Sequence, residues 1–265
     1  MTGLSTMSNG NGYRDNVASH RIADSLRTAI LDGSYLPGER IRQEDIAARS
    51  GASRIPVREA LRMLDAEGLI TLVANSGAWV TRLSLAECVE TYLIRERLEP
   101  LLLRTSLPRL DAAVLDRMGE LAAEMEASSG VDAFMRADRE FHLSSYSGAA
   151  SGEMWQIIHR MWNTTQHYRR EFTRLAAGTQ EPGLAVTHME HRLLVDCLRR
   201  QDPSRTDITA RDQPPRPACW ASRSAASPAA PSTMWSGMVA ARPAVCCTTC
   251  ASSCVSKSRP AALCG

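Results

Sequence analysis

Apolar residues recur every three to four positions up to about residue 200, which predicts a mainly α-helical protein. At the start of the chain, the pattern predicts a helix at 17–32, a Pro-Gly turn at 37–38 and two short helices at 42–49 and 54–67. Two strands follow, at 69–73 and 78–83. Asn75-Ser76-Gly77, between the strands, favours a β-hairpin. This order of elements is that of a winged helix-turn-helix, which places one helix in the major groove of DNA.

The pattern from 84 to 212 stays helical. Glycines and a Pro-Gly pair divide this stretch into five complete helices and the start of a sixth, so an all-α helical bundle is expected here as a second domain. The expected fold class is therefore mostly α: an N-terminal winged helix-turn-helix at 17–82, made of three helices and a β-hairpin wing, and then the bundle. Residues 1–16 are polar and rich in Gly and Asn, and we expect them to form a disordered arm.

The composition changes sharply after residue 212. Residues 213–265 contain no Asp or Glu, and they hold six of the eight cysteines. A cysteine-rich metal knuckle fits poorly, because the cysteine spacing matches no zinc pattern and no histidine lies nearby. Two interpretations stay open, a disordered tail and an out-of-frame translation of a GC-rich gene, and the second fits the loss of acids best.

Positive charge is concentrated around the predicted helix 54–67, the helix expected to enter the major groove. Residues 49–62 carry four arginines against one acid, whereas the whole chain has a net charge of only +2. Arg54 and Arg58 are four positions apart and lie on one helix face, and Ser53 is placed to cap the helix. Arginines on such a face can bind phosphates and read guanine edges, although a solvated basic helix face would look the same. The residues expected to contact DNA are Arg42, Ser53, Arg54, Ile55, Arg58 and Gly77.

A second candidate site lies in the predicted bundle. Asp138 and His142 are four positions apart on a helix whose buried side carries Phe134 and Phe141. A carboxylate and an imidazole that face inward need a partner, and His191 on a later helix could complete a set of three metal ligands. The alternative is an ordinary buried polar cluster. A metal-dependent hydrolase with Asp138, His142 and His191 is the rival function, but the sequence offers no evident general base beside these residues.

Two runs of sequence identify a family resemblance. The run PGERI…DIAARSGASRIPVREALRMLDAEGLI…NSGAWV resembles the DNA-binding domain of GntR-type bacterial transcription regulators over about residues 20–82. It departs from that pattern at Gln43, usually Glu, and at Ile55, usually a small polar residue. The runs YLIRERLEP, ADREFH and MEHRLLVDCL resemble the FCD effector domain of the FadR subfamily over 84–212, and six helices resemble its VanR-like branch.

The resemblance implies a ligand-responsive transcription regulator rather than an enzyme. It implies a repressor of a metabolic operon that binds a palindromic operator in double-stranded DNA as a homodimer. In such domains Asp138, His142 and His191 would hold a divalent metal, zinc or nickel, and Gln213 stands where a fourth ligand, a histidine, is expected. A small organic acid would bind beside the metal, at Arg95, His167 and Arg169. No apolar run is long enough to span a membrane and no signal peptide is evident, so a cytoplasmic protein without a membrane partner is expected.

Overall fold

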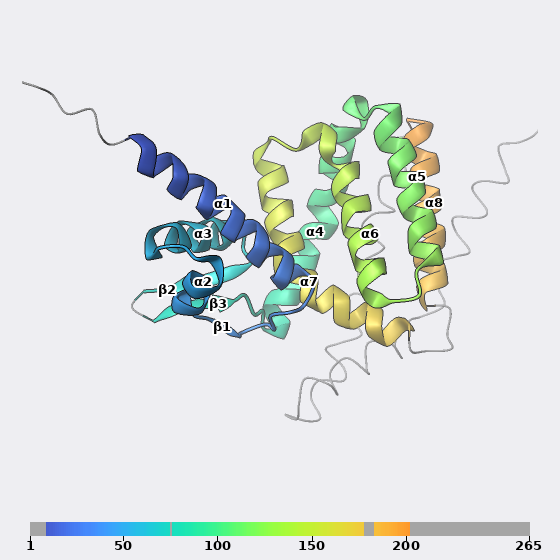
Figure 1. The fold of residues 1–265 in the computed structure, drawn as a ribbon. Helices are drawn as coiled ribbons and strands as arrows, with labels where there is room; N and C mark the ends of the chain where they lie inside the picture. Colours follow the sequence, from blue (N-terminus) through green and yellow to red (C-terminus); the bar gives the residue numbers. More distant parts are fainter. Residues whose placement is uncertain (1–8, 75, 178–182, 202–265) are drawn as a thin grey trace, which may run out of the picture. The chain divides into compact units, whose positions relative to one another are not determined.

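The computed structural model describes residues 9–74, 76–177 and 183–201 (Figure 1). The chain divides into two units, Met1–Pro214 and Pro215–Gly265, and the second unit lies outside the described residues. The helices and strands of the first unit are α1 (Asn9–Leu31), β1 (Arg40–Ile41), α2 (Gln43–Ser50), α3 (Arg54–Ala66), β2 (Ile70–Val73), β3 (Gly77–Val80), α4 (Leu85–Ser106), α5 (Ala112–Ala127), α6 (Val131–Ser145), α7 (Glu153–Ala177) and α8 (Gly183–Arg199).

The first six of these elements, α1 to β3, with the turns between them, form the predicted winged helix-turn-helix, which we call the reader. Its strands make one antiparallel sheet in the order β1-β3-β2. Alternate strand residues face inward, so Ile41, Ile70, Ala78 and Val80 are buried while Arg40 is exposed. The buried strand residues join apolar residues of α1, α2 and α3 in one hydrophobic cluster. This cluster gives the reader a core of its own.

Local sequence explains how the two short helices of the reader meet. Gly51 ends α2 in the left-handed region with φ of 62°, a conformation that glycine adopts without strain. Pro56 lies in the first turn of α3 and is buried. Ser53 occupies the N-cap position of α3, as predicted, but its side chain makes no capping hydrogen bond. The start of α3 is therefore set by the turn and by Pro56 rather than by a serine cap.

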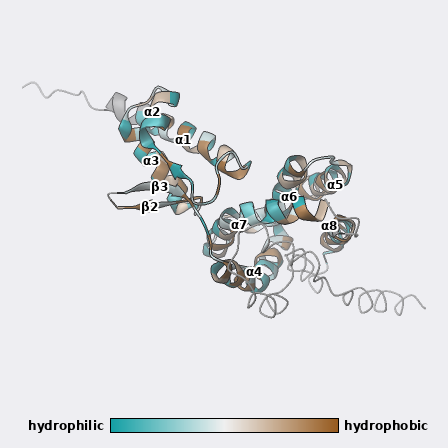
Figure 2. Ribbon diagram, turned by 90° about the horizontal axis from the view of Figure 1, so that it is seen from below, coloured by the Kyte–Doolittle hydropathy of each residue, from teal (hydrophilic) through white to brown (hydrophobic). Residues whose placement is uncertain are grey.

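The second half of the described chain is a bundle of five α-helices, as the pattern predicts. Ser84 and Glu87 form a reciprocal capping box at the start of α4, and Asp111 caps α5. Helix α5 packs against α6 and α8, while α7 packs against α4, α6 and α8. Figure 2 shows these helices side by side and nearly end-on, each with apolar and polar segments. A second hydrophobic cluster, separate from that of the reader, fills the space between them.

The structure corrects two details of the sequence prediction. Helix α1 begins at Asn9, inside the stretch 1–16 that was expected to be a disordered arm. The sheet has a third strand, β1, which pairs with β3. The expected sixth helix of the bundle and the whole of 213–265 lie outside the described residues. Among the described helices none is long and apolar enough to cross a membrane.

Helix α7 also contacts the reader. Arg160 donates to the carbonyls of Asp65 and Ala66, both at 2.8 Å, at the end of α3. Asn163 donates to the carbonyl of Glu67 at 2.8 Å. One turn further on, Tyr168 donates to the carbonyl of Leu83 at 2.8 Å and accepts from its N–H at 2.7 Å. A cation beside the last carbonyls of a helix is favourable, so these contacts stabilise the carboxyl end of α3.

Candidate functional site

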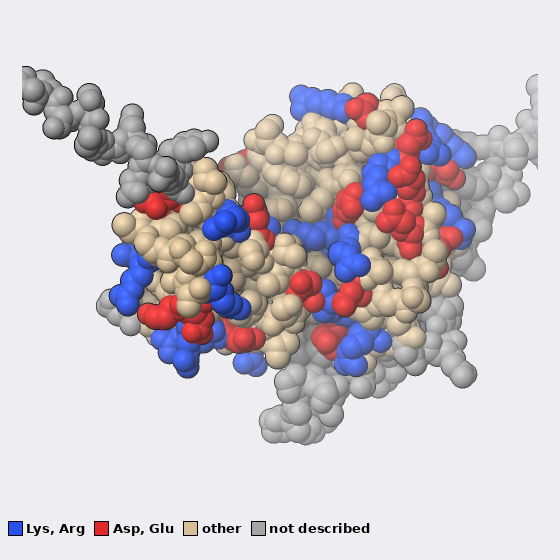
Figure 3. All heavy atoms as spheres, viewed as in Figure 1, with Lys and Arg blue, Asp and Glu red and all other residues tan. Residues whose placement is uncertain are grey.

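A basic groove lies between α3 and the sheet of the reader. Five arginines line it, together with one glutamate, Glu44. The arginines of the groove are Arg40, Arg42, Arg54, Arg58 and Arg62. Figure 3 shows basic side chains gathered over the reader, interspersed with acidic ones. An open groove of this charge suits the phosphates of a nucleic acid.

Four of the six residues predicted to contact DNA, namely Arg42, Arg54, Arg58 and Gly77, line this groove. Ser53 and Ile55 do not line it; both are exposed at the start of α3, and Ile55 is 64% exposed. A large apolar side chain in that position contributes nothing to the core of the reader. Its exposure leaves Ile55 available for contact with an apolar group, such as the methyl group of thymine.

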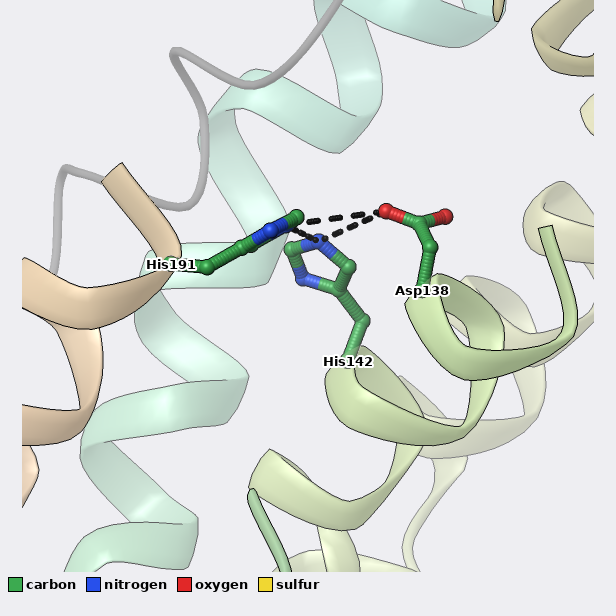
Figure 4. Close-up of side chains that lie close together, drawn as sticks. All are labelled: Asp138, His142 and His191. Carbon is green, nitrogen blue, oxygen red and sulfur yellow. Dashed lines mark hydrogen bonds and ion pairs between the residues drawn. The ribbon is translucent and has the colours of Figure 1, made fainter. Parts of the chain in front are cut away.

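Asp138, His142 and His191 come together inside the bundle (Figure 4). Asp138 and His142 project from α6 and His191 projects from α8. The Nε2 atoms of the two histidines are 3.2 Å apart, and each lies 3.6 Å from Oδ1 of Asp138. Zinc binds such atoms at about 2.0–2.2 Å, so neighbouring ligands in a tetrahedral shell lie about 3.4 Å apart. The three observed separations therefore fit a single metal ion.

Burial keeps the two imidazoles in the form that a metal needs. His142 and His191 are 2% and 1% exposed. Burial, assisted by His191 and Arg95, lowers the pKa of His142 well below its ordinary value. Burial, assisted by Arg169, lowers the pKa of His191 to about 4. Both rings are therefore neutral at pH 7, which leaves a nitrogen lone pair on each ring to bind a cation.

Two of the three residues predicted to bind an effector lie beside this triad. Arg169 on α7 forms an ion pair with Oδ2 of Asp138, the oxygen that faces away from the histidines. The guanidinium of Arg169 stacks 3.8 Å from the centre of the Trp162 ring, and that of Arg95 stacks 4.5 Å from it. The rings of Trp162 and His142 are 4.9 Å apart. Trp162 therefore connects both arginines to the triad.

Arg95 is completely buried, although it carries a charge. Its Nε donates to Glu99 at 2.6 Å and its Nη1 donates to Thr165 at 2.9 Å. Burial works against the charge, but the nearby Glu99 and Tyr92 outweigh it and raise the pKa of Arg95. Nη2 of Arg95 and the hydroxyl of Tyr92 are buried without a hydrogen-bond partner among the described residues. Such unpaired donors are costly and leave a place for a bound polar group.

His167, the third residue predicted to bind an effector, lies elsewhere. It is buried on the face of α7 that carries Asn163 and Arg170, whereas Arg169 and Trp162 are on another face. Burial, assisted by Arg170, lowers the pKa of His167 to about 4. The structure therefore does not bring His167 to the triad.

Two residues of the site were missed from the sequence. Glu99 accepts hydrogen bonds from Arg95 and, at 3.0 Å, from Trp162. The four-residue spacing from Arg95 to Glu99 was visible in the sequence and is typical of a helical ion pair. Trp162 was visible only as one of several aromatic residues on its helix.

Comparisons with known proteins decide the family. The model described as bacterial regulatory proteins, gntR family, matches residues 18–80, and the model of the FCD domain matches residues 90–211. The chain is 31% identical over 192 residues to the probable D-xylose utilization operon transcriptional repressor of Paenarthrobacter nicotinovorans, covering 72% of this chain and 82% of that protein. The chain belongs to the GntR family.

Other relatives agree with the GntR assignment. The Nta operon transcriptional regulator of Aminobacter aminovorans is 32% identical over 183 residues, which are 68% of this chain and 83% of that protein. The solved structure of E. coli McbR/YncC, 19% identical, shares the fold with a TM-score of 0.61 over 73% of this chain and 91% of that one.

This GntR-family chain is thus a DNA-binding transcriptional regulator with a helical FCD domain. The family is one of regulators and not of enzymes, so the hydrolase with Asp138, His142 and His191 is rejected. Gln213, at the expected fourth ligand position, lies outside the described residues. The role predicted for it stays a prediction.

Proposed function

We propose that this protein is a metal-containing repressor that releases its operator when a small organic acid binds in the FCD domain. The observation that carries the proposal is the cluster of Asp138, His142 and His191 beside two arginines that stack on one tryptophan. Cation ligands and anion-binding groups lie together inside one bundle. An apolar core would serve stability better, so such a cluster is expected to bind something.

The metal would be zinc or nickel, because two imidazole nitrogens and one carboxylate oxygen suit these ions. Asp138 would offer Oδ1, while Arg169 holds Oδ2 and thereby fixes the plane of the carboxylate. When bound, the ion would supply a positive centre that attracts an anion. Gln213 would offer only an amide oxygen in the fourth position, and amide oxygen is a weak ligand for these metals. We therefore expect weak metal binding.

The effector would be a small carboxylate. The free Nη2 of Arg95 can donate to a carboxylate oxygen, and the unpaired hydroxyl of Tyr92 offers a second donor. The Arg95 guanidinium lies 5.2 Å from the centre of the Tyr92 ring, so one ligand can reach both groups. The relative from Paenarthrobacter nicotinovorans is described as a probable transcriptional repressor of a D-xylose utilization operon. That description supports repression as the sign of control and a metabolic operon as the target.

The operator would be palindromic and the protein a homodimer. One recognition helix reads only a few base pairs, and a second copy supplies the other half-site. Helix α4 offers a surface for the second copy, because Leu93, Ile94 and Leu101 are 46%, 37% and 43% exposed on one side of it. A regulator of operons would act on DNA in the bacterial cytoplasm.

Helix α7 would transmit the signal. Arg169 contacts Asp138 in the bundle, while Arg160 and Asn163 of the same helix contact the end of α3. A ligand that displaces Arg169 or Trp162 would also move these contacts, because a helix shifts as a unit. The recognition helix would then change its position relative to that of the second copy.

The test begins with metal. The protein is purified without added metal, and the metal content is measured by elemental analysis before and after addition of zinc. We expect substoichiometric metal and a zinc-dependent rise in melting temperature, since a ligand at one hundred times its Kd stabilises by about 2.7 kcal/mol. His142→Ala should abolish the rise. His159→Ala is the matched control, because His159 lies on α7 outside the triad. Equal zinc responses in both variants would refute the metal site.

The effector is tested by release of DNA. A library of small carboxylates is screened for compounds that lower the affinity of the protein for its operator. Arg95→Lys should lose this response while it keeps operator affinity, because lysine keeps the charge but not the planar fork. A carboxylate that releases both proteins equally would show that Arg95 does not hold the effector.

A further inference from the structure

Strand β1, which pairs with β3 and so extends the wing, carries an arginine that the family resemblance does not single out. Arg40 on β1 lies directly opposite Trp79 on β3, so their side chains share the solvent face of the sheet. The Arg40 guanidinium carbon lies 5.7 Å from the centre of the Trp79 ring. Nη2 of Arg40 donates to the carbonyl of Ser76 at 3.1 Å, at the tip of the wing. Two contacts thus hold the exposed end of this side chain.

Gly77 completes this arrangement. Its φ is +124°, a value that L side chains rarely adopt. A β-carbon built there would lie 3.6 Å from Nε of Arg40 and 3.7 Å from the Trp79 ring. The arginine is therefore packed along the glycine backbone and against the tryptophan. The β1 strand, the glycine and the tryptophan together set the direction of one guanidinium.

The Arg40 charge has no acidic partner in the part of the chain that the structure describes. No ion pair between described residues includes Arg40, whereas Arg62, across the same groove, is paired with Glu59 at 2.5 Å. Arg40 lines the groove that also contains Arg54 and Arg58 of the recognition helix. An arginine has five N–H donors, and the Ser76 carbonyl uses one of them. Most of its donors stay available to an anion at the edge of the groove.

We propose that Arg40 is the contact of the wing with the DNA backbone, and that Trp79 is the residue that positions it. The partner is a phosphate that flanks the bases read by α3, because Arg40 presents an exposed guanidinium at the edge of a basic groove. Arginine has about 2 kcal/mol of rotamer entropy, and a side chain that is already ordered loses less of it on binding. The inference rests on the proposed operator binding and adds a named residue to it.

The experiment measures affinity as a function of salt with the full chain. Two duplexes of equal length are used, one selected from a random pool by the wild-type protein and one of random sequence. Each phosphate contact contributes about 0.9 to the slope of log K against log salt. Arg40→Ala should lower that slope by about 0.9 and weaken both duplexes by the same factor. Arg21→Ala is the matched control, because Arg21 is exposed on α1 and outside the groove, and it should change neither value.

Trp79 is tested by a double-mutant cycle. Trp79→Leu should weaken DNA binding about twofold to fivefold, which corresponds to the loss of an exposed cation–π contact. Trp79→Phe should keep most of the wild-type affinity, because phenylalanine retains an aromatic face. In the Arg40→Ala background the same Trp79→Leu change should have no further effect on affinity. A purely structural tryptophan would cost the same in both backgrounds. Melting temperatures measured on the same samples show whether each variant is folded.

Three results would overturn the proposal. An unchanged salt slope in Arg40→Ala would show that Arg40 touches no phosphate. Loss of affinity for the selected duplex alone would show that it reads a base. Additive effects of the two substitutions would show that Trp79 does not act through Arg40. If the wild-type protein selects no sequence, operator binding fails, while the slope on the random duplex still tests Arg40.

Discussion

Glu99 offers the sharpest test of how the bundle holds its buried charge. Its carboxylate accepts from Arg95 at 2.6 Å, from Trp162 at 3.0 Å and from Tyr146 at 3.2 Å, and both members of the ion pair are 0% exposed. Glu99→Gln keeps the size and one acceptor oxygen but removes the negative charge. Arg95 would then be a buried cation without a counter-charge, and breaking such a pair costs about 3–5 kcal/mol.

The loss should be large compared with the total stability. Domains are stable by about 5–15 kcal/mol, and urea slopes are about 1–3 kcal/mol per molar. The urea midpoint should therefore fall by about 1–5 M. Circular dichroism of the helices follows the unfolding. Glu120→Gln is the matched control, since Glu120 is an exposed partner of Arg117, 65% accessible. Exposed pairs contribute about 0–1 kcal/mol.

The double variant Arg95→Leu/Glu99→Leu separates stability from function. Replacing a buried ion pair by apolar residues of similar volume is often neutral or stabilising, so the double variant should recover most of the stability. It should nevertheless lose the response to the carboxylate effector. If Glu99→Gln unfolds at the same urea concentration as Glu120→Gln, Arg95 is not a desolvated cation that depends on Glu99.

Three further predictions concern other parts of the protein. Arg58→Ala should cost roughly 1–3 kcal/mol of operator binding, measured by fluorescence anisotropy, and unchanged affinity in both the Arg58 and the Arg54 alanine variants would remove them from the interface. Gln213→His should raise the bound zinc measured by elemental analysis, and a full equivalent in the wild type would show that Gln213 is not limiting. His167 has a pKa near 4 when folded and near 6.5 when unfolded, so its contribution is present above pH 6.5 and is lost as the pH falls toward 4. In chelator-treated samples the free energy of unfolding should fall less between pH 7.5 and pH 5 for His167→Gln than for the wild type, by about 2 kcal/mol. Equal losses in both proteins would contradict the burial of this ring.

The reader was predictable from local sequence because each boundary has a local cause. Gly51 stops one helix and Pro56 starts the next, and Asn75-Ser76-Gly77 marks the hairpin. Strand β1 escaped prediction because two residues are too few to show an alternating pattern. Its consequence, the pairing of Arg40 with Trp79, depends on a register between strands far apart in the chain.

The bundle site was only half predictable. Asp138 and His142 share one helix, so their spacing placed them together. His191 lies on a different helix, so the sequence pattern could name it only as a candidate, and it reaches Asp138 and His142 because α8 packs into the bundle. The sequence could not show that His167 lies on another face of α7 than Arg169, because α7 is buried on several sides, against α4, α6, α8 and the reader, and no single polar face marks the site.

The arrangement of α7 explains why costly polar groups lie where they do. Arg95, Glu99 and Asp138 are buried, and an apolar core of the same volume would be at least as stable. These groups can interact with more than one partner. Oδ2 of Asp138 pairs with Arg169, and Oδ1 lies near the two histidines. A cation at the histidines and an anion at Arg95 would each change the balance of charge around Trp162. Asn163, the residue after Trp162, donates to the carbonyl of Glu67 at the end of α3. A change of charge around Trp162 would therefore act on α7 directly beside its contact with the reader. Under the proposed function, ligand binding and DNA binding would be linked through α7, which requires that each ligand favours one position of α7 over another.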